Sequence, residues 1–230
     1  MSRWYCLSSL LVGTMTYLMI AMTCSAAEKF VPEEGFVSLF DGETMNGWRP
    51  HLGVPKAHIG GKWEVRDGML IGDQDENQGG GFLITDGKYE NFILRFDLYQ
   101  DYPTDTGIFV RMQEDGKSHQ ITFDNRPEGQ IGSIYLPWTQ RRVHDNLDGA
   151  KFFQQGAWNH VELRVEGEPS RIQLFINDAK VTDFQHTAAT TKGVGTKGHI
   201  GLQVHPKTPG IIHWKAGNTI RYRNIRIKPL

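Results

Sequence analysis

Short segments in which apolar and polar residues alternate with a period of two run through the sequence, and they constrain the fold more than any other feature. In residues 89–99, every second residue from Phe92 to Leu98 is Phe or Leu. Successive side chains of a strand point to opposite faces, so this pattern predicts a strand buried on one side. The same pattern or a β-rich composition recurs in residues 107–113, 158–165, 172–176, 181–184, 199–205 and 221–227.

Turn signals separate these segments, and no stretch longer than a turn or two keeps a helical period. Asp67-Gly68 and Asp86-Gly87 are typical turn pairs, and Asn177-Asp178 lies where two strands would form a hairpin. Many short strands with one apolar and one polar face indicate an all-β, two-sheet antiparallel sandwich or jelly roll.

The N-terminus has the pattern of a secretory signal peptide over residues 1–27. A basic start with Arg3 precedes an apolar run, which ends in small uncharged residues before Glu28. We therefore expect one domain over residues 28–230, exported to the periplasm or secreted and free of the membrane after cleavage. A lipoprotein at Cys24 is disfavoured, because Met22 and Thr23 make a poor lipidation motif. An uncleaved anchor is disfavoured because the apolar run is near the lower limit for a membrane span and has no stop-transfer flank.

Charge and motif content exclude several classes of protein. The chain has 25 Lys and Arg against 26 Asp and Glu, so nothing favours nucleic acid as a partner. Both cysteines precede residue 28, which rules out a disulfide framework or a thiol nucleophile in the exported domain. The Gly-x-Ser-x-Gly and His-Glu-x-x-His motifs are absent, as is the Glu-x-Asp-x-x-Glu strand of many β-sandwich glucanases.

Polar residues on predicted strand faces are the main functional signal. Gln203 and His205 share one face of a strand, and Arg111 and Asp124 lie on the polar faces of two others. Aromatic residues Tyr135 and Trp138 lie in a nearby Gly- and Pro-containing segment. A concave polar face edged by aromatic rings suits a sugar, although water alone also explains a polar sheet face.

Eight segments match the pattern of one known family: residues 36–48, 63–70, 89–96, 107–111, 132–135, 158–160, 198–205 and 223–227. On these segments, which span essentially the whole exported part, the sequence resembles the 3-keto-disaccharide hydrolase domain family. The resemblance implies a concanavalin A-like jelly roll of the lectin and glucanase type, acting on 3-keto-disaccharides or 3-keto-glycosides.

The chain also departs from the family pattern. Asp105-Thr106 replaces an Asn-Ser pair, His119 replaces a glutamate that precedes Asp124, and residues 207–219 form a longer link. The resemblance implies Asp124 or His119 as the base that removes the C2 proton. It further implies oxygen contacts from Arg111 and Gln203, and a proton donor or metal ligand at His205.

Three functions stay open from the sequence. The first is an exported hydrolase that cleaves keto-modified disaccharides or glycosides, using no certain cofactor, with a divalent metal as an option. The second is a non-catalytic, lectin-like module that binds glycans on the same face, with Tyr135 and Trp138 as stacking platforms. The third is a conventional glycosidase whose carboxylates come from different strands. The sequence assigns neither metal ligands nor an oligomeric state.

Overall fold

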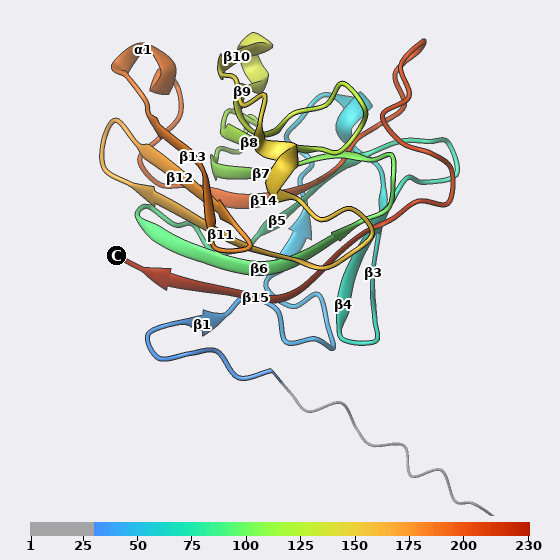
Figure 1. Cartoon of the computed structure of the whole chain (residues 1–230), viewed down its shortest axis with the longest axis horizontal. Coiled ribbons are helices and arrows are strands. Elements are labelled where there is room, and N and C mark those ends of the chain that lie inside the picture. Colours follow the sequence, from blue (N-terminus) through green and yellow to red (C-terminus); the bar gives the residue numbers. More distant parts are fainter. Residues whose placement is uncertain (1–29) are drawn as a thin grey trace, which may run out of the picture.

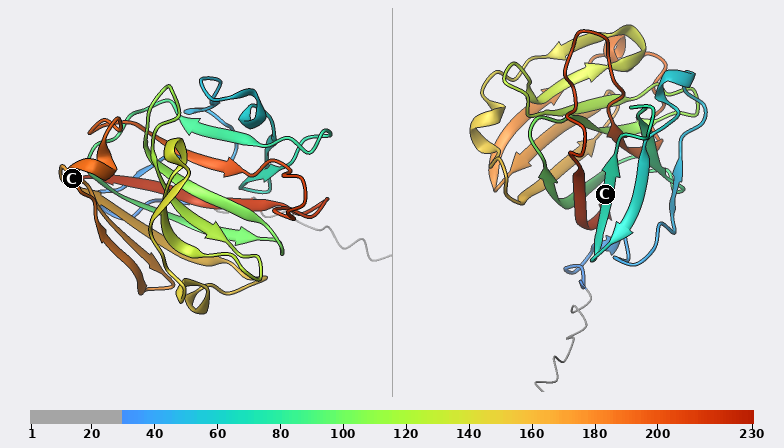
Figure 2. Two further views of the ribbon diagram at one scale, coloured as in Figure 1. Left: turned by 90° about the horizontal axis from the view of Figure 1, so that it is seen from above. Right: turned by 90° about the vertical axis from the view of Figure 1, so that its right-hand side faces the viewer.

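The structure is a computed structural model that describes residues 30–230. The predicted signal peptide, residues 1–27, lies outside the described residues. The described chain forms two antiparallel sheets packed face to face, with a few single-turn helices in the connections (Figures 1 and 2). The prediction of a two-sheet antiparallel sandwich is confirmed.

One sheet, here called the β6 sheet, follows the order β13-β12-β11-β6-β15-β4-β3, with β1 paired to β15. Its strands pair antiparallel throughout. They are β1 (Val37–Ser38), β3 (Lys62–Arg66), β4 (Met69–Asp73), β6 (Phe92–Gln100), β11 (Asn159–Glu166), β12 (Arg171–Ile176), β13 (Ala179–Gln185) and β15 (Ile220–Pro229).

The other sheet, here called the β7 sheet, follows the order β10-β9-β8-β7-β14-β5-β2. Its strands are β2 (Trp48–Pro50), β5 (Gly81–Thr85), β7 (Asp105–Met112), β8 (His119–Asp124), β9 (Ile131–Leu136), β10 (Arg141–His144) and β14 (His199–Val204). The helices are η1 (Lys56–His58), η2 (Pro137–Thr139), η3 (Gly149–Phe152) and α1 (Ala188–Thr191).

The main hydrophobic core lies between the two sheets, and the alternating residues supply it. In β6 the even-numbered residues from Phe92 to Leu98 are buried, whereas the odd-numbered ones are partly exposed. In β14, Ile200, Leu202 and Val204 belong to the same core. The odd-numbered residues of β14 must then face the other side of the β7 sheet, which positions the site.

The predicted hairpin forms where the sequence placed it. Strands β12 and β13 pair antiparallel across Asn177 and Asp178, and both of these residues have positive φ angles, 49° and 67°. Such φ angles match the right-handed twist of the flanking strands, and Asn and Asp tolerate them better than most residues. Across residues 30–230 no helix is long and apolar enough to cross a membrane.

Candidate active site

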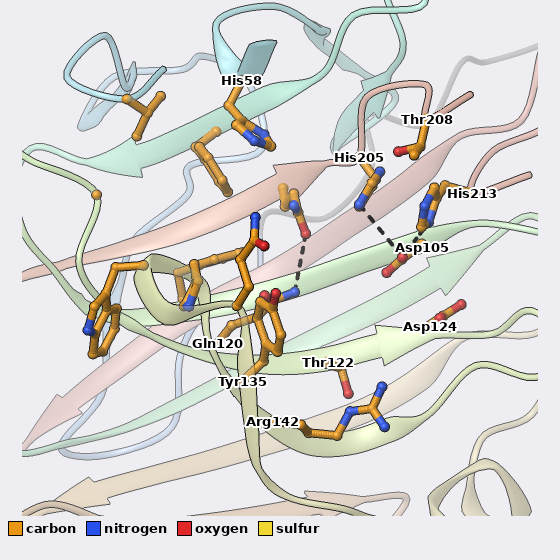
Figure 3. A pocket seen from close by; sticks show the side chains of 18 of the residues that line it. His58, Asp105, Gln120, Thr122, Asp124, Tyr135, Arg142, His205, Thr208 and His213 are labelled. Atoms are coloured by element: carbon orange, nitrogen blue, oxygen red, sulfur yellow. Dashed lines mark hydrogen bonds and ion pairs between the residues drawn. The ribbon is translucent and has the colours of Figure 1, made fainter. Parts of the chain in front are cut away.

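A pocket of about 740 Å³ opens on the face of the β7 sheet that points away from the core (Figure 3). The register of the strands arranges its floor in rows that run across the sheet. In β7 and β8, Asp105 is the Cα partner of Asp124, Gly107 of Thr122 and Phe109 of Gln120. Since alternate residues of a strand share a face, these three pairs lie on the pocket side, about 7 Å from one row to the next.

We name the rows by their chemistry. The charged row contains Asp105 and Asp124, with His205 following the end of β14. The amide row contains Gln203, which pairs with Phe82 of β5, and Thr122. The aromatic row contains Phe109, Gln120 and Tyr135, the last being the Cα partner of Gln120 in β9. Asp105, Asp124 and His205 therefore lie at one end of the floor, and Phe109 and Tyr135 at the other, where Arg142, the Cα partner of Tyr135 in β10, also lines the pocket.

Asp105 connects two histidines at the charged end. His213 donates from Nδ1 to Asp105 Oδ2 at 2.8 Å, and the imidazole rings of His205 and His213 stack with their centroids 3.8 Å apart. His205 Nε2 lies 3.9 Å from the same carboxylate oxygen. Figure 3 shows the three side chains pointing toward one another at one end of the pocket. A carboxylate that orients imidazoles is a common arrangement for proton transfer.

The tautomer of His205 follows from its backbone contact. Its Nδ1 lies 2.7 Å from the carbonyl oxygen of Pro206, which can only accept, so Nδ1 carries the proton. Neutral His205 therefore presents a lone pair at Nε2 on the side of Asp105. Burial lowers the pKa of His205, and the Asp105 carboxylate opposes that shift. A proton taken up at Nε2 would face the carboxylate charge.

The same cluster has the donor set for a metal ion. One ligand atom each from Asp105, His205 and His213 lies within 4.8 Å of the others. A metal-ligating histidine commonly donates its second ring N–H to a carbonyl group, as His205 does to Pro206. These three residues are thus the ones that could hold a divalent cation.

A guanidinium group is the main cation beside this cluster. Arg126 donates from Nε and Nη2 to the two carboxylate oxygens of Asp124, at 2.8 and 2.6 Å, and its Nη2 lies 3.5 Å from Asp105 Oδ2. A bidentate pair of this kind fixes the guanidinium in one orientation. Arg126 is thereby held where it can bind an oxygen that gains negative charge.

The middle of the floor carries amides and little side-chain bulk. Gln120 Nε2 lies 3.4 Å from Gln203 Oε1, a long contact that leaves both amides available to hydroxyl groups. A Cβ atom at Gly107 would come within 2.6 Å of the Gln120 amide. Glycine at this position therefore allows the Gln120 side chain to lie across the sheet.

Five of the predicted residues line this pocket: Asp124, His205, Gln203, Tyr135 and Trp138. They come from strands β8, β9 and β14, from the residue that follows β14 and from helix η2, and the register brings them together. Arg111 and His119, by contrast, do not line the pocket, and a physical reason explains the position of each.

Arg111 turns away from the pocket because β7 bulges at this residue. Its φ is +51°, and the register against β14 shifts so that Met112 lies with Phe109 in one apolar cluster. The Arg111 side chain, 1% exposed, instead contacts Glu168 at 3.1 Å and the carbonyl oxygen of Gly167 at 2.8 Å. Simple alternation had predicted a common face for Arg111 and Phe109, and the bulge breaks that alternation.

His119 lies on the inward face of β8, with Ile121 and Phe123 of the core. It is fully buried, and its ring stacks on that of His186 with the centroids 3.8 Å apart. Residues of odd and even number in one strand face opposite ways, so His119 and Asp124 cannot share a site. Neither His119 nor Arg111 lines the pocket.

Asp105, His213 and Arg126 were missed from the sequence. Asp105 did differ from the family pattern, and its position two residues before Gly107 places it on the face of Phe109. His213 lies in a link without periodicity. A hydrogen bond of 2.8 Å from the Asp105 N–H to the His213 carbonyl oxygen connects this link to β7. Only the tertiary structure reveals this contact.

Comparisons with known proteins agree with this architecture. A 3-keto-disaccharide hydrolase of Bacteroides thetaiotaomicron is 24% identical over 249 residues, which cover 87% of this chain and 80% of that protein. Among solved structures, a candidate glycosyl hydrolase from Parabacteroides distasonis has a TM-score of 0.61 at 18% identity, covering 88% of this chain and 99% of the other.

A β-1,3-1,4-glucanase from a mouse hindgut metagenome shares the fold as well. Its TM-score is 0.56 at 13% identity, with 85% of this chain and 98% of the other covered. These two structural likenesses support the concanavalin A-like sandwich expected from the sequence. The family model for the 3-keto-alpha-glucoside-1,2-lyase-like domain matches residues 35–228, nearly all of the described chain. The resemblance found in the sequence is therefore confirmed, and the chain belongs to this 3-keto-alpha-glucoside-1,2-lyase-like family.

Proposed function

We propose that the chain is a hydrolase that cleaves the glycosidic bond of 3-keto-disaccharides and 3-keto-glycosides. Its family and the name of its Bacteroides relative support this class of substrate. The observation that carries the proposal is the cluster of Asp105, His205 and His213 beside Arg126 at one end of the pocket. The cluster offers a proton acceptor, a stabilising negative charge and a cation for a developing oxyanion within one site.

The chemistry follows from the ketone at C3. The carbonyl group makes the proton on C2 acidic, so a base can remove it and leave an enolate. The substituent on C1 is then β to the carbanion and leaves with the electrons of the C1–O bond. Water adds to C1 of the resulting enone and a proton returns to C2, so that the sum of the steps is hydrolysis.

His205 is the proposed base. Its Nε2 lone pair takes the C2 proton, and the imidazolium formed lies 3.9 Å from the Asp105 carboxylate, which stabilises the positive charge. His213 holds that carboxylate in place through its Nδ1–H. The protonated His205 can then return its proton to the departing oxygen, as the elimination requires.

Arg126 is the proposed group for the C3 oxygen. A guanidinium fixed before the reaction stabilises an enolate without reorganising at the moment of proton transfer. Asp124 acts on Arg126 rather than on the sugar, since Arg126 binds both of its carboxylate oxygens. This assignment replaces the earlier expectation of Asp124 as the base. Gln120 and Gln203 are left to bind hydroxyl groups.

The test is turnover of 3-keto-trehalose by the chain from residue 28 onward, followed as release of glucose, with and without EDTA. We expect release from the 3-keto sugar and none from trehalose itself. His205→Gln should lower the rate about 10³-fold, as removal of a general base does. The control is His160→Gln, a half-exposed histidine on the far face of the β6 sheet.

The outcomes separate the alternatives. Loss of turnover in EDTA, restored by a divalent cation, would assign the Asp105 cluster to a metal instead of to proton transfer alone. Binding of trehalose without turnover of its 3-keto form would contradict the proposal in favour of a glycan-binding module. Turnover of unmodified trehalose would favour a conventional glycosidase.

A further inference from the structure

The two ends of the pocket differ in a way that bears on the leaving group. Asp105 and Phe109 point to the same side of β7 and are four residues apart, which places them about 13 Å from each other along the strand. The ring that reacts must lie against the charged row, where His205 and Arg126 are. The pocket continues from there to the aromatic row, so the far end is available to the group attached at C1.

From the amide row to the far end the pocket has an apolar wall made of Val54, Pro55, Phe82 and Phe109, all of which line the pocket. The rings of Phe82 and Phe109 meet edge to face with their centroids 4.8 Å apart. With Ile84 and Met112 they form a hydrophobic cluster separate from the main core, and Val54 packs against it. The side chains of this wall offer no hydrogen-bonding group.

The wall is held in place before any ligand arrives. His51 is 1% exposed; its Nε2 donates to the carbonyl oxygen of Gln113 at 3.1 Å, and its Nδ1 accepts the N–H of Gly53 at 3.1 Å. These bonds tie the segment carrying Val54 to the end of β7. Gly116 lies against Val54, since a Cβ atom there would come within 2.9 Å of Val54 Cγ1. A preformed wall costs little to order on binding.

By register, the polar side chains beside this wall are the amides of Gln120 and Gln203, the Cα partners of Phe109 and Phe82. The other polar groups on this side offer a second sugar few partners. Asp115 forms an ion pair with Lys117, and His58 stacks on Phe82 with the ring centroids 5.9 Å apart. Among residues 30–230, His58 Nδ1 is buried without a hydrogen-bond partner. Each sugar hydroxyl buried against the wall would lose its hydrogen bonds to water, whereas an apolar ring would not.

From this arrangement we propose that the apolar wall is a binding site for an aromatic or similarly apolar leaving group, so that aryl 3-keto-glucosides are preferred over 3-keto-disaccharides. The inference rests on the proposed function for its reaction, but the binding preference itself can be measured without turnover. Val54 and Phe82 are then residues that determine specificity.

The first test is calorimetric binding of phenyl α-glucoside and trehalose, which carry the same glucosyl group and no ketone. We expect the phenyl glucoside to bind at least about 10-fold more tightly, which corresponds to about 1.4 kcal/mol. Val54→Asn, on a loop rather than in a strand, should remove most of this preference by weakening the binding of the phenyl glucoside. Val37→Asn, an exposed valine of β1 in the other sheet, is the matched control.

Equal or tighter binding of trehalose, failure of both sugars to bind, or equal weakening of both by Val54→Asn would overturn the inference. The second test compares kcat/KM for the 3-keto forms of the same two compounds, in wild type and in Val54→Asn. Since phenoxide is intrinsically the better leaving group, the change caused by the substitution is the quantity to read. If both compounds are turned over, and the ratio of their kcat/KM values is the same in wild type and in Val54→Asn, this inference is overturned and the proposed function stands. Tight, Val54-dependent phenyl glucoside binding without any turnover would contradict only the proposed function.

Discussion

Two pairs of stacked histidines in this chain have nearly the same internal geometry but different surroundings. His205 and His213 stack at 3.8 Å with an angle of 17° between the rings, and His119 and His186 stack at 3.8 Å with 15°. The first pair lines the pocket and contacts Asp105. The second pair is buried and contacts the hydroxyl groups of Ser170 and Thr190.

The surroundings determine what each pair can do. Burial lowers the pKa of His119 to about 3, with further contributions from His186 and Arg111, and lowers the pKa of His186 to about 4. The Nε2 atoms of both rings lack hydrogen-bond partners among the described residues. An imidazole with no nearby carboxylate and no access to solvent stays neutral and packs as an aromatic ring. Beside Asp105, by contrast, the carboxylate opposes the effect of burial on the pKa of His205, so the carboxylate distinguishes the proposed catalytic pair from the buried one.

The largest expected difference between the pairs comes from removing the partner ring of each. His213→Ala should lower kcat about 10²- to 10³-fold with little change in KM, because Asp105 loses the donor that orients it toward His205. His186→Ala should leave kcat per folded molecule unchanged and lower the melting temperature, since it empties a buried site. Steady-state kinetics with thermal unfolding of both variants measures this. A similar loss of kcat in both variants would contradict the distinction.

The buried pair should make folding sensitive to acid. Below pH 6.5 the unfolded chain binds protons at His119 and His186, whereas the folded chain does not until the pH reaches about 3 to 4. The unfolded state then binds more protons, so the free energy of unfolding falls as the pH falls below 6.5.

His119→Phe removes one of these groups. At about 1.4 kcal/mol per pH unit, wild type should lose about 2 kcal/mol more than His119→Phe between pH 6.5 and 5. Urea denaturation at a series of pH values measures the difference, with His160→Phe as the control on the exposed face. If the free energy of unfolding changed with pH in the same way in wild type and in His119→Phe, His119 would bind its proton equally well in the folded and unfolded chain, which would contradict the prediction.

The same comparison shows how far the sequence could predict the site. Alternation correctly identified the inward faces of β6 and β14, because hydrophobic burial acts within single strands. His205 and Gln203 followed from that pattern. The bulge at Arg111 breaks the alternation, and no residue type near Arg111 predicts a bulge. His213 lies in a 15-residue irregular link between β14 and β15. Tertiary contacts alone bring this link back to the pocket, so the sequence pattern could not predict the position of His213. The resemblance supplied the expected substrate class, but its glutamate position pointed to His119.

The smallest expected effects distinguish Arg126 in the pocket from the buried Arg111. Arg126→Lys keeps the charge but loses the bidentate bond to Asp124, so kcat/KM should fall about 10-fold with the free energy of unfolding nearly unchanged. Arg111→Lys should lower the free energy of unfolding by about 1–3 kcal/mol, because the carbonyl oxygens of Glu90 and Gly167 lose a charged donor. Its kcat/KM should stay at the wild-type value. If Arg111→Lys instead reduced kcat/KM in a fully folded protein, the bulge in β7 would have to transmit its effect to Phe109 and Asp105, and Arg111 would become a positioning residue of the pocket.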